Sequence, residues 1–161
     1  MAEIDRVKGL LREAVADDVA EDIVAIGWFH REDSGNDSLA HGPRLLRRVF
    51  AKRDDHPADH LGSRNVLVLT PTRVLVYAGK AEAPLVRVTK RVGAWPIAGV
   101  TATAKNHTAE SYMQNSGGTV RTRMLRATLT FSDDTAPLTM DFQRDQLGKE
   151  CVAAVQAACD R

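Results

Sequence analysis

The sequence is poor in the residues and motifs on which enzyme chemistry usually depends. Its 161 residues include two cysteines, two tryptophans, two tyrosines and four phenylalanines. It has no Gly-x-Ser-x-Gly nucleophile turn, no glycine-rich phosphate loop and no His-Glu-x-x-His metal motif. These absences predict a protein without catalytic activity and without a cofactor.

Long apolar runs are also missing. No run approaches the ~20 residues that span a bilayer, and the first eight residues lack the basic and then apolar order of a signal peptide. We therefore expect a cytoplasmic protein with no transmembrane segment. Cys151 and Cys159 lie eight residues apart in a predicted helix, about 12 Å along its axis, which is too far for a disulfide. We expect both to be small core residues.

The net charge of +1 hides an uneven distribution of charge along the chain. Residues 1–40 carry four basic and ten acidic side chains, residues 41–126 carry fifteen and five, and residues 127–161 carry three and six. The three segments therefore carry net charges of −6, +10 and −3. The basic middle predicts either a surface for an anionic partner or a sheet that packs against acidic terminal helices.

The strongest structural pattern lies at residues 65–77, which read Asn-Val-Leu-Val-Leu-Thr-Pro-Thr-Arg-Val-Leu-Val-Tyr. Two arms rich in Val and Leu flank the turn at 70–73, which predicts a β-hairpin. Pro71 has a fixed negative φ, which excludes a two-residue type I′ turn and fits a type I turn. Because neither arm alternates with polar residues, we expect both faces of the hairpin to be covered.

Apolar periodicity predicts the remaining elements. Helices with one apolar face are expected at residues 3–16 and after Asp145, whose side chain is placed to cap the second of them. Residues 43–53 fit either a short basic helix or a strand. Further strands are expected at 22–30, 85–92, 99–104, 119–131 and 136–142. Connections without regular structure are predicted at Gly79–Pro84 and at the polar residues 105–118.

This order of elements, together with two short motifs, resembles a known family. The segment 66–76 contains the turn Thr-Pro-Thr-Arg between aliphatic arms, and residues 95–100 read Trp-Pro-Ile-Ala-Gly-Val. The chain resembles the bacterial pleckstrin-homology-like (PH-like) domains and the related GRAM-type domains over roughly residues 20–159. The resemblance implies an α+β, mostly β, fold. Residues 21–161 would form a PH-like barrel or sandwich of about seven antiparallel strands closed by a C-terminal helix, with an amphipathic helix before it in residues 1–20.

The resemblance also implies a non-catalytic binding or adaptor module, since family members bind phosphoinositides, other lipids or proteins, and some assemble into oligomers. The loop after residue 30 is acidic and does not match the basic lipid-binding motif of eukaryotic members. We therefore expect a protein partner or self-association. The predicted contact is the apolar stripe of the N-terminal helix, formed by Ile4, Val7 and Leu11.

The alternative is peripheral association with anionic membrane lipids through the basic central segment. The second and third groups of basic residues, around Arg87 and Arg121, would form one positive face if their strands were adjacent. Aromatic residues make up only 5% of the chain, which argues against nucleic-acid binding through stacking. The candidate anion or partner surface comprises Arg47, Arg48, Lys52, Arg53, Arg87, Arg91, Arg121 and Arg123.

Residues 54–60 form the densest group of potential metal ligands. His56 and His60 are four residues apart, which is a metal-ligand spacing on a helix. Pro57 lies between them and no third His or Cys adjoins, so a solvated loop is the alternative. These two histidines are the weak metal candidates of the sequence.

Overall fold

The computed structural model describes residues 1–31, 56–113, 115 and 117–161. The described elements are, in chain order, α1 (Ala2–Val15), β1 (Ala25–Arg31), the 3-10 helix η1 (Pro57–His60), β2 (Asn65–Leu69), β3 (Arg73–Glu82), β4 (Leu85–Pro96), the 3-10 helix η2 (Ile97–Gly99), β5 (Val100–Met113), β6 (Gly118–Phe131), β7 (Leu138–Gln143) and α3 (Gln146–Cys159). This content confirms the predicted α+β, mostly β, class.

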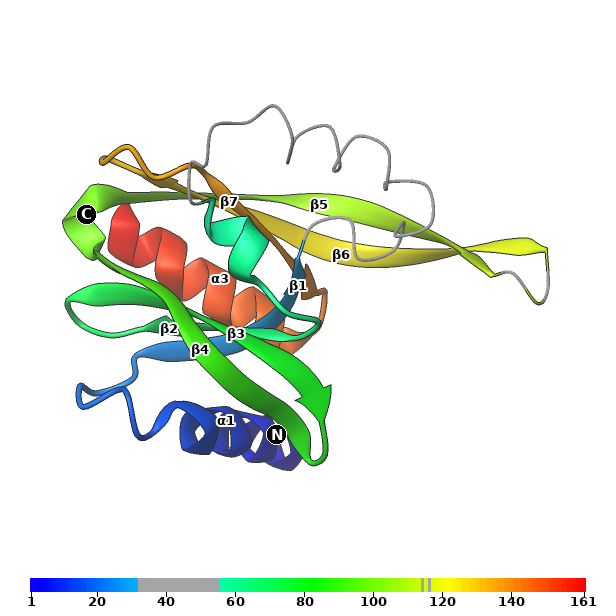
Figure 1. The fold of residues 1–161 in the computed structure, drawn as a ribbon, viewed down its shortest axis with the longest axis horizontal. Helices are drawn as coiled ribbons and strands as arrows, with labels where there is room; N and C mark the ends of the chain where they lie inside the picture. Colours follow the sequence, from blue (N-terminus) through cyan, green and yellow to red (C-terminus); the bar gives the residue numbers. More distant parts are fainter. Residues whose placement is uncertain (32–55, 114, 116) are drawn as a thin grey trace.

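The strands form one antiparallel sheet in the order β4-β3-β2-β1-β7-β6-β5. β1 joins its two halves, because residues 25–29 pair with β2 whereas His30 and Arg31 pair with β7. The half made of β1–β4 and the half made of β5–β7 lie on opposite sides of α3 (Figure 1). Sheet and helix therefore enclose one main core.

The main core lies around α3, which begins where Asp145 accepts a hydrogen bond from the backbone N–H of Gly148 at 2.8 Å. This confirms the predicted cap. Cys151 is buried, and burial raises the pKa of its thiol to about 12, which keeps the thiol neutral at ordinary pH. A Cβ at Gly27 of β1 would lie 2.9 Å from Cβ and Sγ of Cys151, so only glycine lets α3 approach β1 this closely. The second cysteine, Cys159, is half-buried against the same core.

A second cluster lies on the other face of the β1–β4 half, where α1 packs (Figure 1). Leu11 and Val15 are buried there against side chains of β2 and β3 that include Val66 and Leu75. All five residues of β2 are buried. The expectation that both faces of the hairpin are covered is confirmed, because α3 covers one face and α1 the other.

The β2–β3 hairpin itself is confirmed, with Val66 opposite Tyr77 and Leu69 opposite Val74. Its turn is fixed by Glu21, whose carboxylate accepts hydrogen bonds from the hydroxyls of Thr72 and Thr70 at 2.6 and 2.7 Å and from Nε of Arg73 at 2.7 Å. The bonds from Thr72 and Thr70 lower the pKa of Glu21 most, and Arg73 adds to the effect. The turn is thereby tied to the segment that leads into β1.

Two predicted connections are strands instead. β3 continues to Glu82, so most of the expected connection at 79–84 is strand. In the expected loop at 105–118, residues 105–113 extend β5 and Gly118 begins β6. Their polarity suggested a loop because a strand normally buries one face. Here the two strands leave the core together, so neither face has to be apolar.

Candidate functional site

The predicted partner stripe on α1 is part of the domain. Leu11 is fully buried, and Ile4 and Val7 are partly buried against the same cluster. The helix is also held by an ion pair between Lys8 Nζ and Glu150 Oε2 of α3 at 2.7 Å. In the docked helix, the stripe therefore stabilises the fold, and a partner would meet the polar face of α1.

The two histidines have structural contacts. Nδ1 of His56 accepts a hydrogen bond from the N–H of Ala58 at 3.3 Å and caps η1. Nδ1 of His60 lies 3.0 Å from Nζ of Lys90. Within the described ranges, no group of three or more His, Cys, Asp or Glu residues is placed to hold a metal ion.

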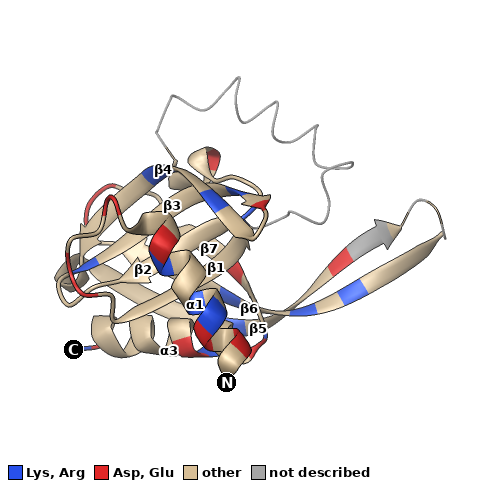
Figure 2. Ribbon diagram, turned by 90° about the horizontal axis from the view of Figure 1, so that it is seen from below, with Lys and Arg blue, Asp and Glu red and all other residues tan. Residues whose placement is uncertain are grey.

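The described residues of the predicted basic surface do not lie on adjacent strands. Arg47, Arg48, Lys52 and Arg53 lie outside the described residues. β4, which carries Arg87 and Arg91, lies at one end of the strand order, whereas β6 lies near the other end, between β5 and β7. The condition for one positive face, that these strands are adjacent, is therefore not met, and Figure 2 shows basic and acidic segments interspersed over the ribbon.

Three of the candidate arginines also have acidic neighbours. Arg87 pairs with Glu82 at 2.9 Å and Arg91 with Asp18 at 3.3 Å. Arg121 pairs with Glu110, its cross-strand partner, at 2.8 Å. Their charges are locally compensated, so they are weak candidates for an anionic ligand.

The most distinctive surface is a two-stranded arm. β5 and β6 pair without a register shift from Val100 opposite Phe131 to Met113 opposite Gly118. Phe131 is buried in the main core, but the first six residues of β6 are all exposed. Figures 1 and 2 show the far part of this ribbon projecting away from the body. We call the described residues between 107 and 124 the β5–β6 arm.

The arm carries features that favour binding. Met113 is 49% exposed and Val120 is 46% exposed. Because Ser111 is opposite Val120 and Met113 is opposite Gly118, these apolar side chains share one face as diagonal neighbours. No strand in the described part of the chain pairs with the outer edge of β5, so that edge offers backbone donors and acceptors.

The sequence contained one signal of this arm. The strand predicted at 119–131 is 13 residues long, whereas its predicted hairpin partner at 99–104 has only six. Antiparallel partners in a hairpin need similar lengths, because every ladder bond needs a residue on each strand. The mismatch indicated that the first strand continues into the polar segment.

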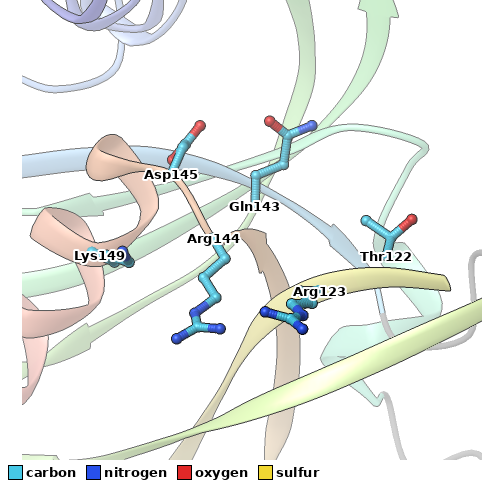
Figure 3. Close-up of a pocket in the computed structure, with 6 residues that line it drawn as sticks. All are labelled: Thr122, Arg123, Gln143, Arg144, Asp145 and Lys149. Carbon is cyan, nitrogen blue, oxygen red and sulfur yellow. The ribbon is translucent and has the colours of Figure 1, made fainter.

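A second surface lies at the root of the arm. Arg123 of β6 lines a pocket of about 490 Å³ together with residues from the end of β7 and the start of α3 (Figure 3). Two of these, Arg144 and Lys149, were not among the candidate residues. They lie in the acidic C-terminal segment, residues 127–161, where a count of charge by segment hides them.

No model of a known protein family matches the chain, and no curated protein sequence matches it either. No helix among the described residues is long and apolar enough to cross a membrane. The β5–β6 arm and the basic pocket at its root are the candidate functional surfaces.

Proposed function

We propose that this protein is a non-catalytic binding module of the PH-like type and that its main ligand is another protein. The strand order supports the family assignment. β1 to β4 are consecutive antiparallel neighbours, β5 to β7 are likewise, and a helix follows the last strand. The resemblance to PH-like domains implies about seven antiparallel strands closed by a C-terminal helix, and this order of elements agrees with it.

The β5–β6 arm is the single observation that carries the proposed function. An isolated two-stranded ribbon is only marginally stable in water, because it has no core of its own. A partner that adds a strand to the β5 edge would satisfy its backbone groups and cover Met113 and Val120. The proposed ligand is therefore an extended protein segment with apolar side chains on one face.

Shortening the arm tests this function. Residues 110–121 are replaced by Asn-Gly, so that Ala109 and Thr122, which are register partners, flank a two-residue turn. The matched control is Val24→Ser, which alters an apolar side chain that is 57% exposed outside the arm. We expect the shortened protein to remain folded and to lose its partner or its self-association, as measured by quantitative affinity capture and by light scattering. Identical partners and mass for the shortened and control proteins would contradict the proposal.

Association with anionic membrane lipids is the second candidate function, and the basic pocket favours it. Sedimentation with vesicles of anionic phospholipid at low and high salt measures it. Binding that weakens as salt increases and that decreases in Arg123→Gln is expected, because charged contacts at a surface are screened. No binding at low salt would exclude this candidate.

A further inference from the structure

We propose that the pocket at the root of the arm binds a phosphate group. The pocket has a volume of about 490 Å³ and is formed where β6, the β7–α3 turn and α3 meet (Figure 3). Its lining residues are Thr122, Arg123, Gln143, Arg144, Asp145 and Lys149.

Three basic side chains reach this pocket from three different elements. Arg123 comes from β6, Arg144 from the turn after β7, and Lys149 from the beginning of α3. Figure 3 shows the side chains of Arg123 and Arg144 converging from β6 and from the turn. Their convergence depends on the fold, since the residues are 21 positions apart in the sequence.

These three basic residues differ in their surroundings from described arginines that face a carboxylate, such as Arg87, which pairs with Glu82. As far as the structure is described, none of the three basic residues forms an ion pair. The one acidic lining residue, Asp145, already accepts the N–H of Gly148 at 2.8 Å. The adjacent Glu150 is bound by Lys8 and Gln146 at 2.7 Å each. The lining therefore has a net charge of +2, and a bound anion would relieve the repulsion among its cations.

The donor set fits phosphate well. The planar guanidinium groups of Arg123 and Arg144 can each donate two parallel hydrogen bonds to phosphate oxygens, and Lys149 adds a point charge. Thr122 and Gln143 also line the pocket, but Figure 3 shows their side chains on the opposite side from the two guanidinium groups, so the three basic side chains are the proposed donors. A phosphate presents more acceptor oxygens than a single carboxylate, so it can use more of these groups. The volume also admits part of the molecule that carries the phosphate.

The phosphate site goes beyond the proposed protein contact, because Arg123, Arg144 and Lys149 all lie outside residues 110–121, which the shortened arm lacks. Loss of one function therefore leaves the other measurable. The same chemistry is found in a soluble phosphate compound and in a lipid headgroup.

Amide chemical shifts of the full ¹⁵N-labelled chain, titrated with inorganic phosphate at constant ionic strength, test the site. We expect saturable shifts at residues 122–123 and 143–149. Arg144→Gln and Lys149→Gln should each weaken binding about tenfold, the effect of losing one charge-assisted hydrogen bond. Arg87→Gln, a paired arginine on β4, should leave the affinity unchanged. The same spectra report whether each variant is folded.

A second experiment distinguishes the two sources of phosphate. Vesicles of phosphatidylcholine are compared with vesicles that also contain phosphatidic acid. Sedimentation with the second kind only, lost in Arg144→Gln, would support the site and identify a lipid headgroup. Phosphate binding without sedimentation would support the site and identify a soluble compound. A shift response that does not saturate, or that Arg87→Gln weakens as much as Arg144→Gln does, would overturn the proposal.

Discussion

Replacing Leu11 by alanine distinguishes an integral α1 from a helix that is free to bind partners. The Leu11 side chain is fully buried between α1 and the outer face of the β1–β4 half, in a cluster that includes Ile26, Val68 and Tyr77. The substitution removes three buried carbon groups, each contributing about 0.8 kcal/mol. A residual cavity adds to this loss, so the expected decrease in the free energy of unfolding is about 3 kcal/mol.

Urea denaturation followed by the fluorescence of Trp28 and Trp95 measures this decrease. The midpoint should fall while the slope of the transition stays constant, because the same surface is exposed on unfolding. The melting temperature should fall by roughly 6–12 °C for a chain of this size. The control is Glu13→Ala on the exposed face of α1, which should change stability by less than about 0.5 kcal/mol.

If Leu11→Ala is as stable as Glu13→Ala but loses binding or self-association, the stripe of α1 acts on a partner. The packing of α1 against the sheet would then not describe the protein in solution.

Three further predictions concern polar contacts. Burial, together with the hydrogen bond to Asp18 at 2.8 Å, raises the pKa of Tyr77. The contribution of Tyr77 to stability should therefore be complete below about pH 10 and lost as the pH rises further. Tyr77→Phe should remove this alkaline loss in pH-dependent denaturation. The pKa of Glu21 is lowered, so its contribution should be present above about pH 4.3 and lost as the pH falls; an unchanged acid profile in Glu21→Gln would contradict this. Arg126 and Asp141, with side chains 15% and 7% exposed, form a bidentate pair at 2.8 and 2.9 Å. Arg126→Met alone should lower the free energy of unfolding by about 3–5 kcal/mol. The double variant with Asp141→Leu should recover most of that loss in chemical denaturation.

Local patterns predicted the parts of the fold that depend on local physics. The β2–β3 hairpin followed from its aliphatic arms and from Pro71, and the start of α3 followed from the capping residue Asp145. The lack of alternation in the hairpin also predicted two covering layers. It did not identify α1 as one of them, since an apolar stripe on a helix fits a sheet of its own chain as well as a partner.

The functional surfaces were harder to predict because they depend on how distant segments meet. The polar residues of the β5–β6 arm had the composition of a loop, and only the length of the opposite strand indicated otherwise. The pocket joins Arg123 to Arg144 and Lys149 from a segment with net negative charge. Charge summed along a sequence cannot show clusters that form in space.

Site-specific photocrosslinking from the tip of the arm tests the proposed binding function most directly. A photoreactive phenylalanine is placed at Met113, which is 49% exposed, and for comparison at Val24, which is 57% exposed. Irradiation in the native cell should give one discrete protein adduct from position 113 that is absent from position 24. An adduct with a second copy of the chain and an adduct with another protein both agree with the proposal. Equal, diffuse labelling from both positions would contradict a protein contact at the β5–β6 arm.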